Sequence, residues 1–531
     1  MVKNLLLALL TGILLAIGWP TYGFPMFLFF GFVPLLFAEK QLRKSELKRQ
    51  GLRVFGLAYL AFFVWNVTTT SWLRHASLFG ASFAVFVNTG LMALLILFYH
   101  KYAKRQTQNR ALLFLVTLWI SFEKLHLLWE FSWPWLNLGN GFSEYTSWVQ
   151  WYEYTGTFGG TLWVWILNVV LFKGILIYRK DRSKLKPIIF TTAGFILIPI
   201  IVSFVILKTY KHDGKTVNVI ALQPNIDPYS EKYNMTNIKF LELFKELSNA
   251  KITGSTDFII APETFFAEST PLNQFDNSLL KHRLQSYARE HSNVNIIAGI
   301  SFIDWFHDKS RIRKETNTYK FRPDTWYDDY NSAILINTLD SIPQYNKSKL
   351  VVGVENFPYQ SILKPIIGDA MIDLGGTIAM KTTQDYRSVF SSSNGEFQAA
   401  PIICYESVYG EFVTGYVRNG ANFLAIVTND AWWNETQGHK QHLSYAKLRA
   451  VETRRDIVRS ANTGISAIIN AKGEITNQLA YNEKGALSGQ LTTNEQLTFY
   501  VLAGDYIARI SFFILIFIFL IGFFRRPRTT L

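Results

Sequence analysis

The sequence predicts a polytopic α-helical membrane domain joined to a globular α/β domain. Long apolar runs gather in the N-terminal part of the 531-residue chain, and one more lies near the C-terminus. Residues 215–498, between the last two of these runs, alternate short β-rich segments with helical patterns. Hydrophobic residues make up 49% of the chain and charged residues only 17%, which argues against disorder.

Eight apolar runs are interpreted as membrane spans; several match the roughly 20 residues that a bilayer crossing needs, and the first two are shorter. They cover residues 4–18, 24–38, 54–73, 81–99, 111–129, 161–177, 187–207 and 507–524. The first run follows Lys3 and could also be a signal peptide. However, Gly18-Trp19-Pro20 follows it where a cleavage site would have small residues, which favours an uncleaved anchor.

Lys and Arg residues mark alternate connections between these runs. Residues 39–53, 100–110 and 178–186, with the tail after residue 524, hold eighteen of the 53 Lys and Arg residues against three acidic residues. These segments carry +15, and the rest of the chain sums to −1, within a net charge of +14. By the positive-inside rule the basic segments and both termini face the cytoplasm, and residues 215–498 lie in the periplasm. The charge is therefore a topology signal and does not indicate nucleic-acid binding.

Three domain segments follow from this pattern. Residues 1–214 form a membrane domain with seven spans, residues 215–498 form the globular domain, and residues 499–531 hold the last span and a tail. Inside the globular domain, expected strands lie at 217–222, 257–261, 294–302, 330–337, 396–405, 422–428 and 465–470, and expected helices at 237–249, 279–291 and 442–455.

Three places in the globular domain carry side chains suited to chemistry. Glu263 follows an apolar strand and a proline, at the sheet edge where α/β proteins place their sites. Lys347 lies in a loop, with Lys349 as a rival for the same role. Cys404 ends another apolar strand and precedes a helical run over residues 407–418. A strand-to-helix turn exposes the thiol, and a helix N-terminus favours the thiolate.

Cys404 is the only cysteine, which excludes an intramolecular disulfide and a Cys-rich zinc site. A lone cysteine is either a small buried apolar residue or a nucleophile. A nucleophilic thiol needs a base and donors for the developing oxyanion. No cofactor or metal is expected, because His439 and His442 have no acidic or cysteine partner at ligand spacing and are interpreted as helix-packing residues.

At these residues the sequence resembles the nitrilase superfamily. Pro262-Glu263, Tyr345-Asn346-Lys347 and Cys404-Tyr405-Glu406 are similar to the elements of its Glu-Lys-Cys triad. Residues 429–433, 441–452 and 133–139 resemble its membrane branch, the apolipoprotein N-acyltransferases. The resemblance implies a nitrilase-like αββα sandwich, with Glu263 as general base, Lys347 stabilising the tetrahedral intermediate and Cys404 as nucleophile.

The resemblance also implies supporting or substrate-binding roles for five residues around the triad. They are Glu355, Tyr405, Glu406, Asn429 and Trp432. Lys347 is preferred over Lys349 because the Tyr-Asn-Lys match and the eight-residue step to Glu355 fit the family. The sequence departs from the family at residues 352–354, where the family often has Pro-Phe-Gly, and at residues 433–434, where it usually has Phe-Gly. The family's tryptophan early in this domain has no clear match, and Tyr229 or Tyr233 is the candidate replacement.

The function implied by the resemblance is transfer of a fatty acyl chain from a membrane phospholipid to the N-terminal cysteine amine of diacylglyceryl apolipoproteins. The transfer would proceed through a thioester on Cys404, in the bacterial inner membrane, and without nucleic acid. The protein is expected to be a monomer. Two alternatives stay open: a membrane-tethered nitrilase-type amidase or hydrolase that uses the same triad, and a non-catalytic lipid-binding or transport protein.

Overall fold

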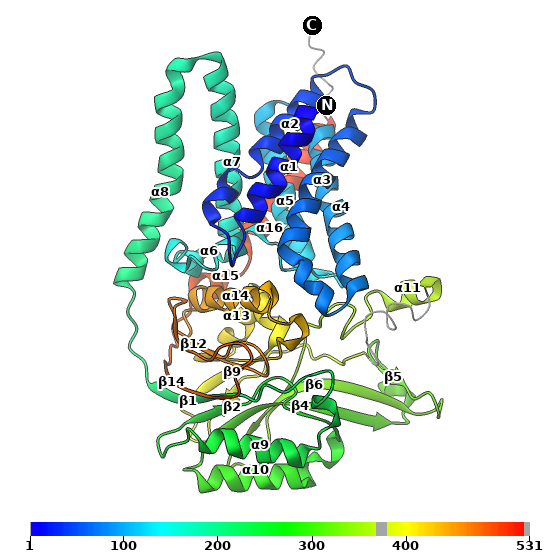
Figure 1. Ribbon diagram of the computed structural model, residues 1–531, viewed down its shortest axis with the longest axis vertical. Helices are drawn as coiled ribbons and strands as arrows, with labels where there is room; N and C mark the ends of the chain where they lie inside the picture. Colours follow the sequence, from blue (N-terminus) through cyan, green and yellow to red (C-terminus); the bar gives the residue numbers. More distant parts are fainter. Residues whose placement is uncertain (1, 368–379, 525–531) are drawn as a thin grey trace. The chain divides into compact units, whose positions relative to one another are not determined.

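The computed structural model describes residues 2–367 and 380–524 (Figure 1). The chain divides into two compact units. The helical unit contains α1 to α8 and α16, and the α/β unit runs from Lys211 to Leu502 and includes His75–Ser77. The membrane-helix class and the α/β class predicted from the sequence are therefore both present in one chain.

The helical unit is built from long apolar helices. Six helical segments of the described residues are long and apolar enough to cross a membrane. Two shorter apolar helices, Val2–Ile17 and Tyr506–Gly522, lie where the first and last of about eight spans are predicted. The α-helices of this unit are α1 Val2–Ile17, α2 Val33–Arg43, α3 Gln50–Thr70, α4 Leu78–Ala103, α5 Gln108–Leu128, α6 Tyr152–Thr155, α7 Thr157–Lys180, α8 Leu185–Thr209 and α16 Tyr506–Phe524.

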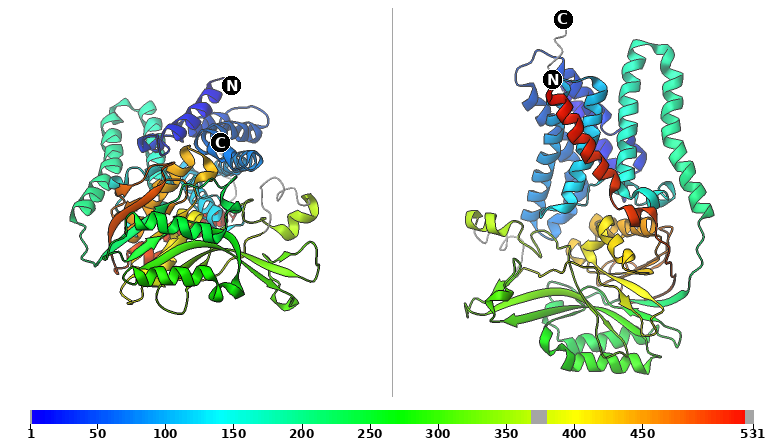
Figure 2. Two further views of the ribbon diagram at one scale, coloured as in Figure 1. Left: turned by 60° about the horizontal axis from the view of Figure 1, so that its bottom comes forward. Right: turned by 180° about the vertical axis from the view of Figure 1, so that it is seen from behind.

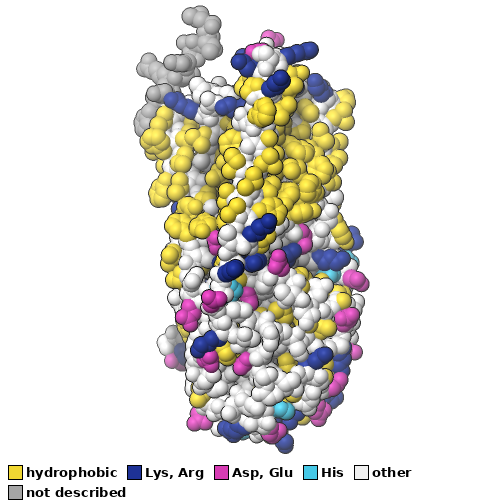
Figure 3. Space-filling model, turned by 90° about the vertical axis from the view of Figure 1, so that its left-hand side faces the viewer, with side chains coloured by type: hydrophobic (Ala, Val, Ile, Leu, Met, Phe, Trp, Pro, Cys, Tyr) yellow, Lys and Arg dark blue, Asp and Glu magenta, His cyan; other side chains and the backbone are white. Residues whose placement is uncertain are grey.

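Helix α8 presents its apolar side chains to the surroundings on almost every side. Ser203 is its buried residue, whereas Phe190 is 75% exposed and Ile198 is 63% exposed. Figure 3 shows hydrophobic side chains gathered over this face of the helical unit. Because water disfavours an apolar surface of this extent, these side chains indicate contact with lipid.

A buried glutamate on α5 holds the loop that follows this helix. The Glu123 carboxylate accepts hydrogen bonds from Trp119 Nε1 at 2.9 Å, from Leu138 N at 2.9 Å and from Thr161 Oγ1 at 2.7 Å. The neighbouring Lys124 pairs with Asp505 at 2.7 Å. Both charged residues inside the run predicted at 111–129 are therefore paired, as polar groups inside an apolar unit must be.

The α/β unit contains two sheets. The larger has the strand order β14-β1-β2-β4-β6-β5, with β3 paired to β4 and β7 paired to β6, and the smaller has the order β13-β12-β11-β10-β9-β8. The strands are β1 Thr216–Gln223, β2 Phe258–Ile260, β3 Phe266–Pro271, β4 Asn295–Phe306, β5 Asn317–Thr318, β6 Trp326–Ile336, β7 Gln344–Asn346, β8 Phe390–Ser391, β9 Gln398–Ile403, β10 Phe423–Thr428, β11 Ile457–Ala461, β12 Ala467–Ile469, β13 Ile475–Gln478 and β14 Gly485–Thr492.

Helices cover the outer faces of both sheets (Figure 2). Helices α9 Asn237–Asn249 and α10 Leu279–Glu290 lie on the larger sheet, and α13 Gly410–Arg418 and α14 Gln437–Thr453 lie on the smaller. The shorter α11 Gln360–Ile367 and α15 Phe499–Ala503 complete the unit's α-helices among the described residues. The layers are therefore helix, sheet, sheet, helix, and the predicted αββα sandwich is confirmed.

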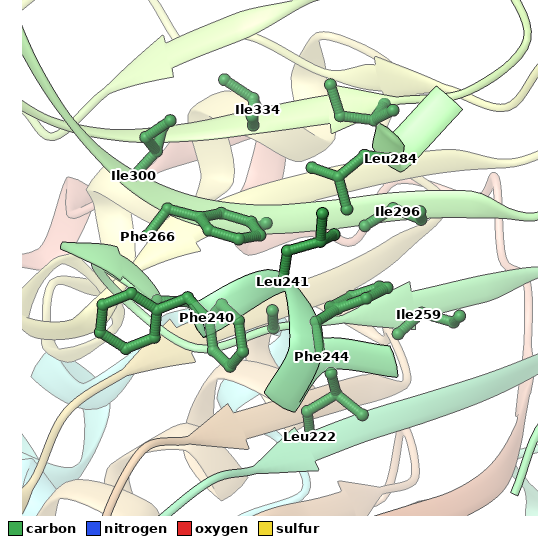
Figure 4. Packing of buried hydrophobic residues seen from close by; sticks show 14 of the residues in the cluster. Leu222, Phe240, Leu241, Phe244, Ile259, Phe266, Leu284, Ile296, Ile300 and Ile334 are labelled. Atoms are coloured by element: carbon green, nitrogen blue, oxygen red, sulfur yellow. The ribbon is translucent and has the colours of Figure 1, made fainter. Parts of the chain in front are cut away.

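The larger sheet and its helices share one apolar core (Figure 4). Phe240 and Phe244, one helical turn apart on α9, meet Leu284 of α10 and the strand residues Ile259 and Ile296. All five side chains are fully buried. Burying an apolar side chain of this size stabilises the fold by about 1.5–3 kcal/mol. This core holds β2 and β4 in place, and the candidate site begins where β2 ends.

We predict that replacing Glu123 with alanine destabilises the helical unit. The change leaves the three donors on Trp119, Leu138 and Thr161 without their buried acceptor, at a cost of about 1–3 kcal/mol for each group left unsatisfied. The apparent melting temperature of the detergent-solubilised protein should fall by several degrees. The exposed Glu46 provides the control, since Glu46→Ala should leave the melting temperature unchanged. Equal melting temperatures for the two variants would contradict this account of Glu123.

Candidate active site

The turn after β2 positions Glu263. Strand β2 is parallel to both of its neighbours, β1 and β4, so its carboxyl end opens at the edge where α/β sheets place their sites. A Cβ atom on Gly299 of β4 would lie 2.4 Å from Thr264 N and 2.5 Å from Pro262 O. Because side chains do not approach backbone so closely, glycine at 299 lets this turn pass directly over β4 and leaves the Glu263 side chain buried.

Lys347 joins two carboxylates. Its Nζ lies 2.8 Å from Glu263 Oε1 and 2.9 Å from Glu355. Asn331 of β6 donates from Nδ2 to the same two carboxylates, at 2.8 Å to Glu263 and 3.1 Å to Glu355. The backbone N of Lys347 also donates to the Asn331 carbonyl. Lys349, the rival lysine, instead has its ammonium 5.1 Å from the centre of the Tyr409 ring.

The charges of this cluster stabilise one another. Burial would raise the pKa of Glu263, but the Lys347 charge, with hydrogen bonds from Lys347 and Asn331, holds this pKa below its ordinary value. Burial would lower the pKa of Lys347, but the carboxylates of Glu263 and Glu355 hold this pKa well above its ordinary value. The carboxylate of Glu263 and the ammonium of Lys347 are therefore both ionised at neutral pH.

Cys404 occupies the predicted turn between a strand and a helix. It follows β9 directly and begins a 3-10 helix, Cys404–Val408, that precedes α13. Its φ of +50° is in the left-handed region, which costs about 1–2 kcal/mol for a residue with a side chain. Burial and the Glu263 carboxylate raise the pKa of the thiol, and the Lys347 charge and Thr428 act in the opposite direction. The expectation of an exposed thiol that favours the thiolate is therefore wrong: the Cys404 side chain is buried, and burial keeps the thiol protonated at neutral pH until a base removes its proton.

Glu406 fastens the Cys404 turn to the loop that carries Lys347. Its Oε1 accepts from the hydroxyl of Tyr345 and the backbone N of Ser348, both at 2.6 Å. Its Oε2 accepts from Ile403 N at 2.9 Å. The predicted supporting residue is therefore fully buried between the two loops, where it sets their separation.

A second buried network lies beneath Cys404. The carbonyl of Cys404 accepts from Ser407 Oγ at 2.7 Å and faces His442 Nε2 at 3.1 Å, so this ring nitrogen is a donor. His442 Nδ1 lies 3.0 Å from Asp430, whose other oxygen binds Arg459 at 2.6 Å. Arg459 and His442 hold the pKa of Asp430 well below its ordinary value, although burial opposes them. This chain of contacts fixes the strained backbone of the cysteine.

The remaining predicted residues lie on the same loops. Tyr405 is buried, with its ring 5.2 Å from that of Tyr409. Asn429 is buried and accepts from the side chain of Asn462 at 3.1 Å. Trp432 is half-buried, and its ring meets Tyr229 edge-on with 5.2 Å between centroids. Tyr229, one of two candidate replacements for the family's early tryptophan, is thus an aromatic neighbour of Trp432.

Comparison with known families identifies this arrangement. The family model described as carbon-nitrogen hydrolase matches residues 218–496, which is more than half of the chain. The chain belongs to the carbon-nitrogen hydrolase family. A second family model, described as the apolipoprotein N-acyltransferase N-terminal domain, matches residues 11–170.

Relatives of this member of the carbon-nitrogen hydrolase family match nearly the whole chain. The apolipoprotein N-acyltransferase of Chlorobaculum tepidum is 25% identical over 522 residues, covering 96% of this chain and 94% of the relative. That of Geobacter metallireducens is 25% identical over 525 residues, covering 95% and 92%. That of Allorhizobium ampelinum is 28% identical over 514 residues, covering 92% and 90%. The chain is therefore similar to these proteins in both of its units.

Sequence reasoning missed several residues of this candidate site in a carbon-nitrogen hydrolase family member. Asn331 is the second residue of the strand expected at 330–337, and it stands beside another polar residue, Ser332, so no motif marks it. The sequence indicates a helix-packing role for His442, and the structure places its ring between Asp430 and the Cys404 carbonyl. Lys232 also went unnoticed, although its Nζ lies 3.0 Å from the Glu263 carbonyl.

We predict that Asp430→Asn strongly destabilises the carbon-nitrogen hydrolase unit. The change removes the negative charge that the buried Arg459 faces at 2.6 Å. Removing one charge of a buried ion pair lowers the free energy of unfolding by about 3–5 kcal/mol, because the other charge stays buried without its partner. Denaturant unfolding of the purified protein should show the loss, and Asp340→Asn, at an exposed position, should show none. Because the pKa of Asp430 is lowered, the wild-type contribution should persist until the pH falls below the ordinary aspartate range.

Proposed function

We propose that the protein transfers a fatty acyl chain from a membrane phospholipid to the N-terminal cysteine amine of diacylglyceryl apolipoproteins. The names of its relatives, apolipoprotein N-acyltransferases that match over 90% of the chain, support this activity. The long apolar helices support it too, because both substrates carry acyl chains anchored in a bilayer. The protein is then an acyltransferase of lipoprotein biosynthesis.

One observation carries the proposal. A cysteine in a strained strand-to-helix turn is fastened, through Glu406, to a loop whose lysine bridges two carboxylates. In this constellation Cys404 is the nucleophile, Glu263 is the general base and Lys347 stabilises negative charge. Glu355 would keep Lys347 oriented, since it accepts from the same ammonium.

In the first half-reaction the sulfur of Cys404 attacks the ester carbonyl of the phospholipid. Glu263 takes the thiol proton as the C–S bond forms, because the raised pKa of the thiol keeps it protonated beforehand. The tetrahedral oxyanion is held by the Lys347 ammonium and the backbone N–H of Tyr405. The C–O bond then breaks, Glu263 returns the proton to the leaving oxygen, and a lysophospholipid departs.

In the second half-reaction the α-amine of the apolipoprotein's N-terminal cysteine attacks the thioester. A C–N bond forms and the C–S bond breaks, while Glu263 takes the proton released by the amine and returns it to the departing Cys404 sulfur, which restores the thiol and the base. Trp432 and Asn429 would support the substrate pocket beside the thioester. Water must be kept from the thioester, because its hydrolysis would release a free fatty acid and waste the acyl group.

The proposed location is the bacterial inner membrane. The distribution of Lys and Arg supports cytoplasmic termini and a periplasmic α/β domain over residues 215–498. Seven spans would precede this domain in residues 1–214, and one would follow it in residues 499–531. The periplasmic side suits the reaction, because apolipoproteins reach that side of the membrane. We propose that the enzyme acts as a monomer.

We predict that mass spectrometry of the purified protein detects an acyl adduct on Cys404. A synthetic diacylated peptide with a free N-terminal amine should remove the adduct and become N-acylated. Cys404→Ala should carry no adduct. Tyr409→Phe, which keeps the ring beside Tyr405 and lies just after the turn, is a nearby control and should still form one.

The two arms of this experiment separate the competing functions. Adduct loss in water, with free fatty acid and no acylated peptide, would establish a hydrolase instead. A folded protein without any adduct, together with cellular function retained by Cys404→Ala, would contradict a catalytic role and favour the lipid-binding alternative.

We predict that the rate of acyl-enzyme formation stays constant from neutral pH down to about the ordinary pKa of glutamate. Below that pH the rate should fall. Glu263 must be ionised to take the thiol proton, and its pKa lies below the ordinary value. Loss of activity with acid should therefore begin below about pH 4.5. Glu263→Gln should slow adduct formation by about 10²–10⁴-fold at neutral pH. A wild-type rate that falls between pH 7 and 6 would contradict the assignment of Glu263 as base.

A further inference from the structure

Lys232 is a buried lysine for which the proposed mechanism has no role. It lies in a short 3-10 helix, Lys232–Asn234, in the loop after β1. Its side chain is among the least exposed of the unit, at 1%. Taking a lysine out of water is costly unless partners compensate, so its position calls for a physical reason.

The partners of Lys232 lie at the base itself. Its Nζ donates to the backbone carbonyl of Glu263 at 3.0 Å and to Thr264 Oγ1 at 2.7 Å. Thr264 has a φ of +44°, a left-handed conformation that a β-branched residue adopts only under constraint. Lys232 therefore holds the strained turn from which the Glu263 carboxylate projects.

The charge balance of the site points to a second role. Lys347 alone faces two carboxylates, Glu263 and Glu355, so these three groups sum to −1. Ionising Cys404 would bring the sum to −2 inside a buried site. The positive charge of Lys232 brings the resting cluster to zero. A thiolate or an oxyanion is then less costly to form, because opposite charge stabilises it in a low dielectric.

The loop that carries Lys232 is fastened to the smaller sheet. The backbone N of Lys232 donates to the Asp227 carbonyl at 3.0 Å. Upstream, Asn462 donates to the Ile226 carbonyl at 2.8 Å and to Asn429 at 3.1 Å. The lysine is thus placed by the loops that surround the candidate site, and it is not an incidental surface residue.

Resting on the function proposed above, we propose that Lys232 is a positioning residue that aligns Glu263 and supplies the second positive charge for the reaction at Cys404. Its charge acts on the thiol through space, and its hydrogen bonds act through the Glu263–Thr264 turn. The other titratable groups in this electrostatically coupled cluster are Glu263, Glu355, Lys347, Cys404, Asp430 and Tyr233.

The charge of Lys232 is itself sensitive to pH, which gives the role a distinctive signature. Burial lowers the pKa of Lys232 to about 8, although Glu263 and Cys404 oppose the shift. The lysine is therefore charged below about pH 8 and neutral above it. Its stabilisation of the thiolate should be present at neutral pH and lost in alkali.

The test measures alkylation of Cys404 by iodoacetamide between pH 6 and 10 in the full-length, detergent-solubilised protein. The variants are Lys232→Met, which removes charge and donors, and Lys232→Arg, which keeps both. Lys281→Met, at a buried lysine paired with Asp276 on the outer helical layer, is the matched control. The wild type should react about tenfold faster than Lys232→Met at pH 7, and this ratio should fall towards one by pH 10.

A ratio that stays constant across this pH range, or equals one throughout, would overturn the proposal, since a merely structural loss has no reason to follow the charge of Lys232. If Lys232→Met is not recovered folded, Lys232→Arg decides alone. Its permanent charge should make it react faster than the wild type at pH 10, and equal rates there would overturn the proposal.

Iodoacetamide needs neither phospholipid nor apolipoprotein, so this readout is independent of the proposed acyl transfer. Absence of the acyl adduct with a pH-dependent alkylation ratio would remove the acyltransferase function and keep the role of Lys232. An acyl adduct together with a constant ratio of alkylation rates would keep the acyltransferase function and remove the role of Lys232.

Discussion

The candidate site depends on one buried carboxylate that connects two sheets. Glu406 accepts from Tyr345 of β7 in the larger sheet, from Ser348 just after that strand, and from Ile403, which ends β9 of the smaller sheet. Lys347 follows β7 in the larger sheet, and Cys404 follows β9 in the smaller sheet. Because a buried carboxylate is costly unless its donors are in place, the packing of the sandwich and the spacing of the reactive groups are fixed by the same hydrogen bonds.

Sequence patterns predicted the layers of the fold and missed its polar strands. The seven expected strands overlap β1, β2, β4, β6, β9, β10 and β12. Strand β11 escaped prediction because Arg459 interrupts its apolar pattern, and this charge is tolerated there only through its contact with Asp430 on another loop. Strand β14 is polar and glycine-containing, and pairing with β1 defines it. Strands β11 and β14 both depend on residues distant in the sequence, and a local sequence pattern does not reveal such contacts.

The residues proposed for the chemistry were identifiable because they stand at strand ends in short motifs. Glu263, Lys347 and Cys404 have this position, and the resemblance to a family selected them from ordinary loop residues. Asn331 and Lys232 have no such motif. Each contacts a residue more than thirty positions away, so only the folded chain shows that both meet Glu263, Asn331 at its carboxylate and Lys232 at its backbone carbonyl.

The pairing of β1 with β14 brings the two ends of the α/β unit together. Thr216 lies opposite Thr492, and just beyond them Lys215 and Thr493 exchange backbone and side-chain hydrogen bonds, the backbone one at 2.9 Å. The polypeptide therefore leaves this unit beside the point where it entered. A module with adjacent ends can be carried in a single loop, because its host needs to supply only two neighbouring attachment points. In evolutionary terms, one insertion between two helices would have been enough to give a helical membrane protein a complete hydrolase fold.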